Sequence, residues 1–130
     1  MFLKYHRLTV LWALFIFIMC SIKIGDNVTH LPLFFPGFDK LAHCGFFFVL
    51  VVFWCNGIIR QQNIKVISYK SAAIITLIAI LYGGSIELLQ LTIFTWRSGE
   101  WSDFFADSLG ASMGIFSAMI IDRAINYETN

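Results

Sequence analysis

Several ionisable side chains lie inside stretches of sequence that are otherwise apolar. Glu87 and Gln90 fall within one long apolar run, and Asp107 falls within another that opens at Asp103. A carboxylate at the centre of a membrane helix costs about 2.5 to 3.5 kcal/mol on insertion scales, so such acids are paired, functional or both. Glu87 is seven residues before Phe94, hence about 10 Å below the end of its run. The chemistry open to these groups is proton transfer, cation binding or ion pairing in a buried pocket.

An imidazole and two cations accompany these acids. Asp39 and His43 are four residues apart, so on a helix they share one face, and the acid could orient the imidazole as a general base. A simple ion pair at the rim of a helix is the open alternative. Arg97 could bridge carboxylates or bind a phosphate bidentately, or it could only mark the membrane interface. Lys40 is the second cation of the group.

Carboxylates with one imidazole suit a hard or borderline divalent ion, so a metal site is chemically consistent with these side chains. However, the sequence contains no HExxH, no P-loop and no GxSxG nucleophile elbow. We therefore predict no bound metal and no cofactor. His43, Glu87 and Asp107 remain candidates for catalysis, although the sequence does not decide whether the protein is an enzyme. The candidate metal ligands would have been Asp39, His43, Glu87, Asp103 and Asp107.

The composition is that of a membrane protein. Of the 130 residues, 58% are hydrophobic and only 13% are charged, whereas soluble domains average about 25% charged residues. The net charge of +1, without a basic stripe, gives no reason to expect nucleic acid as a partner. Four apolar runs are long enough for spans of about 20 residues. We expect an all-α integral membrane bundle of four helices, a single domain over 1–130, with spans at about 8–24, 41–59, 71–94 and 104–121.

The basic residues predict how the bundle is oriented. Six Lys and Arg residues lie beside the amino end, the 60–70 connection and the carboxyl tail, and three lie on the other side. By the positive-inside rule, both termini are then cytoplasmic. Because no small-x-small cleavage site follows the first apolar run, we expect an uncleaved first helix rather than a signal peptide. The polar residues that this orientation places in the outer half are Asp39, His43, Glu87, Gln90, Arg97, Glu100, Asp103 and Asp107.

Residues 24–38 contain both prolines and several phenylalanines, so we predict an interfacial or partly re-entrant loop in which His30 is solvated. The three cysteines, Cys20, Cys44 and Cys55, lie in apolar runs without a CxxC pair and are predicted to be buried thiols. A bridge between Cys20 and Cys44 is the alternative, and it would need an oxidising outer compartment.

Small residues recur every four positions down the fourth span and form a ridge that lets helix backbones approach closely. A shorter ridge begins at Ala79 and Gly83 in the third span. If the two ridges meet, Glu87 and Asp107 are brought toward each other. The fourth-span ridge consists of Ala106, Gly110, Gly114 and Ala118.

Four motifs in register resemble the VanZ-like family of small bacterial membrane proteins, over about residues 36–118. They are DKLAHCGFFF (39–48), SIELLQLTI (85–93), the arginine of TWRSGEWSD (95–103) and DFFADSLGASMG (103–114). The resemblance implies a cell-envelope role, because the family takes its name from a member linked to low-level teicoplanin resistance. It implies Gly110 as the close-packing glycine, and Asp107 stands where many members have asparagine. The ligand-binding positions that it implies are Asp39, Lys40, His43, Glu87, Gln90, Arg97, Asp103 and Asp107.

We therefore predict a multi-pass protein of the bacterial cytoplasmic membrane whose outer site binds an anionic lipid or a lipid-linked cell-wall precursor. Arg97 and Lys40 would bind the phosphate, and Asp39 would orient His43. The three remaining acids, Glu87, Asp103 and Asp107, would hold Arg97 or transfer protons. Two alternatives remain open: a membrane hydrolase or transferase acting on lipid-linked phosphate, and a structural module without a ligand. Membrane lipids are the expected partners, and the sequence does not predict an oligomeric state.

Overall fold

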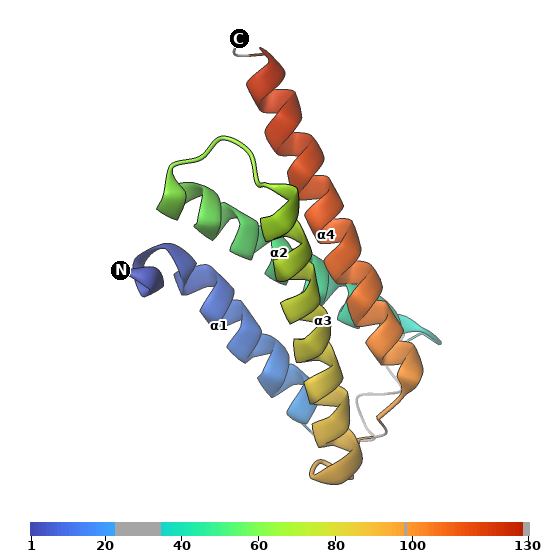
Figure 1. Ribbon diagram of the computed structural model, residues 1–130. Coiled ribbons are helices and arrows are strands. Elements are labelled where there is room, and N and C mark those ends of the chain that lie inside the picture. Colours follow the sequence, from blue (N-terminus) through green and yellow to red (C-terminus); the bar gives the residue numbers. More distant parts are fainter. Residues whose placement is uncertain (23–34, 98, 129–130) are drawn as a thin grey trace.

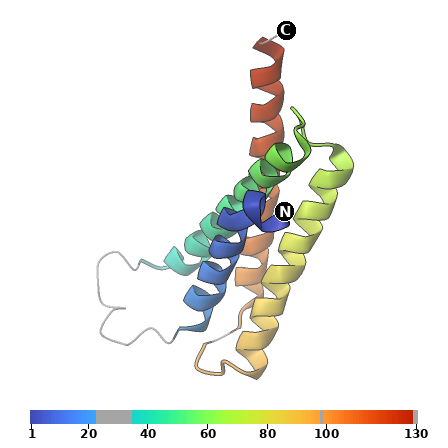
Figure 2. The same ribbon diagram turned by 90° about the vertical axis from the view of Figure 1, so that its left-hand side faces the viewer.

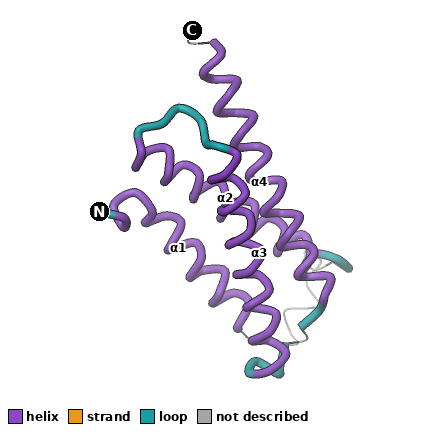
Figure 3. Tube along the Cα trace, in the orientation of Figure 1, coloured by secondary structure: helices purple, strands orange, loops and turns teal. Residues whose placement is uncertain are grey.

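The computed structural model describes residues 1–22, 35–97 and 99–128, and these ranges hold four helices and no strand (Figures 1 and 3). Each helix is long and apolar enough to cross a membrane, judged by length and composition. The predicted all-α bundle of four membrane-spanning helices is therefore confirmed. The helices are α1 (Phe2–Ser21), α2 (Phe38–Gln62), α3 (Tyr69–Thr92) and α4 (Trp101–Glu128).

The helices are longer than most of the predicted spans because a helix continues through polar turns beyond the hydrocarbon layer, whereas hydropathy marks only the apolar part. Thus α1 already begins at Phe2, and α4 continues to Glu128. The start of α3 is fixed by a side-chain cap, since the Ser71 backbone N–H donates to Ser68 Oγ at 3.1 Å. The last two residues of the first predicted span, 23 and 24, lie outside the described residues.

The four helices alternate in direction, so the two chain ends and the α2–α3 connection lie toward one end of the bundle (Figures 1 and 2). The opposite end, which we call the lower end from its place in Figure 1, gathers the carboxyl ends of α1 and α3 with the amino ends of α2 and α4. Every polar residue of the predicted site belongs to one of these helix ends or to the α3–α4 connection. The fold therefore collects them at one end of the bundle.

The most extensive helix interface joins α2 and α4, and glycines of α4 make it close. A Cβ placed on Gly110 would lie 2.8 Å from the carbonyl carbon of Cys44, and one on Gly114 would lie 2.8 Å from the Phe48 carbonyl oxygen. The small-residue ridge of α4 thus packs on the backbone of α2, and not on the α3 ridge. Gly83 of α3 meets α4 at Asp107 instead.

Hydrogen bonds from side chains to backbone attach α1 to the rest of the bundle. Trp12 Nε1 donates to the Phe46 carbonyl of α2 at 2.9 Å, and the Tyr82 hydroxyl of α3 donates to the Ala13 carbonyl at 2.6 Å. Large apolar side chains on the outward faces of all four helices are exposed, as expected for contact with lipid. Membrane lipid is therefore the natural surrounding of this bundle.

All three cysteines are free thiols, so the alternative of a bridge between Cys20 and Cys44 is not realised. Cys20 and Cys55 are buried as predicted, whereas Cys44 is half-buried. The predicted loop over 24–38, including His30, lies mostly outside the described residues. At its described end, α2 already begins at Phe38.

Candidate functional site

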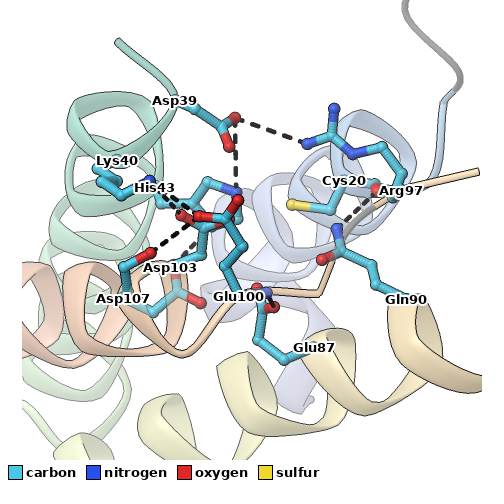
Figure 4. Close-up of polar contacts among 11 residues, drawn as sticks. Cys20, Asp39, Lys40, His43, Glu87, Gln90, Arg97, Glu100, Asp103 and Asp107 are labelled. Carbon is cyan, nitrogen blue, oxygen red and sulfur yellow. Dashed lines mark hydrogen bonds and ion pairs between the residues drawn. The ribbon is translucent and has the colours of Figure 1, made fainter. Parts of the chain in front are cut away.

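The predicted polar residues converge at the lower end of the bundle (Figure 4). Three helices supply them: α2 through its first turns, α3 through its last turns and α4 through its first turns. The connection between α3 and α4 adds two more. Five of the side chains are almost completely buried, and these are His43, Glu87, Gln90, Asp103 and Asp107.

At the centre of this cluster, His43 and Asp107 form a buried pair. Their Nδ1 and Oδ1 atoms are 2.9 Å apart. Asp39 Oδ1 lies 3.9 Å from the other ring nitrogen, Nε2, which is beyond hydrogen-bond distance. The carboxylate that orients the imidazole is therefore Asp107 of α4, and not Asp39 as the helical spacing predicts. Asp107 faces α2 because it shares a helix face with Gly110, which touches the α2 backbone.

The two cations bind acids at the rim of the cluster. Lys40 Nζ lies 3.1 Å from Glu100 Oε2 and 3.6 Å from Asp103 Oδ1. Arg97 Nη2 lies 3.6 Å from Asp39 Oδ1. Arg97 forms no ion pair with any other described acid, so the predicted holding of Arg97 by the buried acids is not seen.

Glu100 is a residue of the cluster that the predicted ligand set omits. Its carboxylate accepts hydrogen bonds from Lys40 and Ser102, and these bonds, together with the charge of Lys40, hold its pKa below the ordinary value. Its backbone N–H also donates to Glu87 Oε2 at 3.0 Å. Glu100 is among the polar residues predicted for the outer half, and its position in the short turn between two site-bearing helices is the sequence signal for including it in the ligand set.

Gln90 connects the site to α1. Its Nε2 donates to the carbonyl oxygen of Cys20 at 2.9 Å, in the last turn of α1 where backbone carbonyls lack helical partners. Trp96 makes a similar contact, since its Nε1 donates to the Ser21 carbonyl at 3.0 Å. Both bonds hold the end of α1 in place. The Gln90 side chain therefore contacts α1 and not the acids around His43.

Glu87 and Asp107 meet His43 where α2, α3 and α4 come together. One donor atom from each of these three side chains lies within 4.8 Å of the donor atoms of the other two. A second group with the same property consists of Asp39, His43 and Asp103. Within these two groups, three buried carboxyl oxygens accept no hydrogen bond from the described residues, namely Glu87 Oε1, Asp103 Oδ1 and Asp107 Oδ2. Such a group can transfer a proton, bind a cation or accept hydrogen bonds from a ligand.

A groove between α3 and α4 reaches this cluster from the side of the bundle. Its volume is about 520 Å³, and its lining is mostly apolar. Three of its leucines, Leu81, Leu88 and Leu91, are more than half exposed on the outer face of α3. The groove is therefore open toward the surrounding lipid. Its acidic lining residues are Glu87 and Glu100.

Comparison with protein families gives one match: the family model described as VanZ/LLP1 covers residues 4–122. No curated protein and no solved structure matches the chain. The matched range includes most of every helix and all eight predicted site positions. Together with the four motifs, it shows that this membrane protein belongs to the VanZ/LLP1 family.

Proposed function

We propose that the lower end of the bundle binds a phosphate-bearing lipid of the bacterial cell envelope, either a membrane phospholipid or a lipid-linked cell-wall precursor. The observation that carries this proposal is the α3–α4 groove, which is apolar along its length and shares Glu87 and Glu100 with the polar cluster. A hydrocarbon chain in the groove would bring the attached head group to the cluster. Ligand sites of this kind combine an apolar lining with a few polar groups that fix orientation.

Arg97 and Lys40 are the groups that would hold the phosphate. The Arg97 side chain is 18% exposed, and its partner Asp39 is half exposed at a distance of 3.6 Å. A phosphate oxygen can replace such a carboxylate, because the guanidinium binds both groups in the same bidentate way. Lys40 is also accessible, with 44% of its side chain exposed.

We place this end of the bundle at the outer face of the cytoplasmic membrane, on the basis of the excess of basic residues at the other end. There the site would meet lipid-linked wall precursors, on which glycopeptide antibiotics act. From that placement we expect this protein to affect teicoplanin sensitivity. The test compares the teicoplanin sensitivity of cells that carry the unchanged protein with that of cells that carry the Arg97→Ala variant.

Replacing Arg97 with Ala is expected to weaken binding of a phosphate-bearing lipid at least about tenfold, because a charge-assisted phosphate contact contributes roughly 1.5 to 3 kcal/mol. Binding is measured with fluorescently labelled phosphatidylglycerol added to the purified protein in neutral detergent. The matched control is Arg123→Ala, which removes an arginine that lies over the Tyr69 ring near the opposite end. Equal affinities of the two variants would contradict the assignment of the phosphate to Arg97.

Filling the groove tests the hydrocarbon part of the proposal. Ser85 is an exposed groove residue whose hydroxyl donates to the Leu81 carbonyl of its own helix at 2.8 Å. We expect Ser85→Trp to weaken binding of the long-chain lipid several-fold while leaving the affinity for a short-chain analogue nearly unchanged. Ser112→Trp is the control, because Ser112 makes the same bond to Ser108 on α4 and does not line the groove. If both tryptophans weaken binding alike, the chain does not lie in the groove.

The buried His43–Asp107 pair favours a second candidate function, a membrane hydrolase or transferase acting on lipid-linked phosphate. An imidazole oriented by a carboxylate at 2.9 Å is the arrangement of a general base. This candidate predicts that the purified protein forms product from a lipid-linked diphosphate and that His43→Ala abolishes the reaction. Lipid binding without turnover would leave the first candidate standing and exclude this one.

A further inference from the structure

The geometry points to a divalent cation site between α2, α3 and α4, formed by His43, Glu87 and Asp107. Each helix contributes one ligand: an imidazole from α2 and a carboxylate from each of the other two. In the sequence these residue types are consistent with a divalent ion, but the three positions are far apart in the chain and match no metal motif, so the sequence predicts no bound metal. The inference concerns ion binding by this chain and does not rest on the proposed lipid.

The three side chains lie close enough together to approach one ion. Their donor atoms lie within 4.8 Å of one another. Three ligands bound at about 2.2 Å to one zinc ion lie roughly 3.4 to 3.8 Å apart, because the angles between the bonds are about 109 to 120°. Donor atoms that start up to 4.8 Å apart would therefore have to approach one another by about 1 Å to close the site. Close packing holds the helices that carry the ligands, since a Cβ on Gly83 would meet Asp107 and a Cβ on Gly110 would meet the Cys44 backbone.

Two carboxyl oxygens in this group lack any described partner. Glu87 Oε1 and Asp107 Oδ2 are buried, and no donor among the described residues reaches them. The residues themselves are only 6% and 0% exposed. Buried polar atoms in native proteins are nearly always satisfied, and two such oxygens beside one imidazole are free to bind a cation. This observation is independent of the spacing and points to the same ion.

The charges of the cluster support the same conclusion. Its described residues carry the carboxyl groups of Asp39, Glu87, Glu100, Asp103 and Asp107, and the permanent cations among them are Lys40 and Arg97. Lys40 binds Glu100 and Asp103, and Arg97 binds Asp39, as Figure 4 shows. Among the described residues, no lysine or arginine forms an ion pair with Glu87 or Asp107, the two acids beside His43. A divalent cation would supply the positive charge that these buried acids lack.

The alternative group of Asp39, His43 and Asp103 fits an ion less well. The Asp39 side chain is 52% exposed and already pairs with Arg97, and Asp103 pairs with Lys40. A cation there would have to displace a protein cation from each carboxylate. We therefore assign the ion to the fully buried group, with Asp39 outside its ligand set.

The donor set selects the class of ion. One imidazole and two carboxylates suit Zn²⁺ or Mn²⁺ better than Ca²⁺, which prefers six to eight oxygen ligands. Three protein ligands leave coordination positions open to water or to an oxygen of a bound molecule. Because Glu87 also lines the α3–α4 groove, an ion held by it would lie where the groove meets the cluster.

The site is tested on the full chain, purified in neutral detergent and stripped with a chelator. Zn²⁺ binding is measured by isothermal titration and metal analysis, and Mn²⁺ binding is measured by electron paramagnetic resonance. We expect about one ion per chain, with at least a tenfold loss of affinity in each of the variants Glu87→Gln and Asp107→Asn. Asp122→Asn is expected to bind Zn²⁺ and Mn²⁺ as the unchanged protein does. Asp122 is a matched control because its Oδ2 is also buried and unpartnered, but it lies far down α4 from this group.

Thermal unfolding with and without the ion provides a second readout, which guards against variants that simply fail to fold. Zn²⁺ is expected to raise the melting temperature of the unchanged protein and to leave that of the Glu87→Gln, Asp107→Asn double variant where it was. The proposal is overturned if the unchanged protein binds no more Zn²⁺ or Mn²⁺ than the double variant does. It is also overturned if Asp39→Asn abolishes binding while Glu87→Gln preserves it. If the protein binds the ion but no lipid, the proposed lipid-binding function is refuted and the ion site stands.

Discussion

Replacing Gly110 with Ala is expected to lower the free energy of unfolding by about 1 to 3 kcal/mol, the usual cost of overpacking a close interface. Replacement with Leu is expected to disrupt the α2–α4 interface altogether. The reason is that an added Cβ meets backbone atoms of Cys44, which cannot rotate away as the end of a flexible side chain can. Stability is measured by unfolding in mixed micelles with increasing denaturing detergent, followed by circular dichroism.

The matched control for this experiment is Gly45→Ala. Gly45 lies inside α2, next to the Cys44 contact, and a Cβ placed on it meets nothing within 4 Å. Since alanine is about 1 kcal/mol better than glycine in a helix interior, the control should be unchanged or slightly more stable. Equal stabilities of the Gly45 and Gly110 variants would show that the close approach of α2 and α4 does not depend on the glycine.

The helices could be predicted from the sequence, but their ends could not be predicted from hydropathy alone. Each apolar run is long enough to cross a membrane, so four helices follow directly. The amino end of α1 carries Lys4 and Arg7, which a hydropathy reading leaves outside the span, yet the helix includes both. The polar end of α4 continues to Glu128 for the same reason. Backbone hydrogen bonding, and not hydropathy, decides where a helix stops.

The contents of the cluster could be predicted, because Glu87, Asp103 and Asp107 stand out in apolar surroundings and the family motifs include them. Which of its side chains pair with one another could not be predicted. Helical spacing suggests Asp39 as the partner of His43, but that spacing says nothing about the rotation of one helix against another. The contact of Gly110 with Cys44 fixes that rotation and turns Asp107 toward His43. Arg97 pairs with Asp39, which the imidazole leaves available.

The His43–Asp107 pair should show strong energetic coupling when both residues are replaced with leucine. Each single replacement leaves one polar group buried without its partner, so His43→Leu and Asp107→Leu are each expected to cost about 3 to 5 kcal/mol. The double variant is expected to regain most of that loss, because replacing a buried polar pair with apolar side chains of similar size is often neutral or stabilising. Unfolding in mixed micelles is measured in the presence of a chelator, so that bound ions do not contribute.

The double leucine variant also separates the stability of the fold from the use of the site. Suppose that the pair served only to hold α2 against α4. The double variant would then keep this interface through the close glycine contacts of α4, and the pair would not be needed. A folded double variant that binds neither Zn²⁺ nor lipid would show that two buried polar groups are kept in the membrane for their chemistry, at a cost in stability. Wild-type ion and lipid binding by the same variant would instead mean that the pair has no part in either site. The positions of the two residues favour the first outcome, because the interface that glycine provides at Gly110 and Gly114 is complete without them.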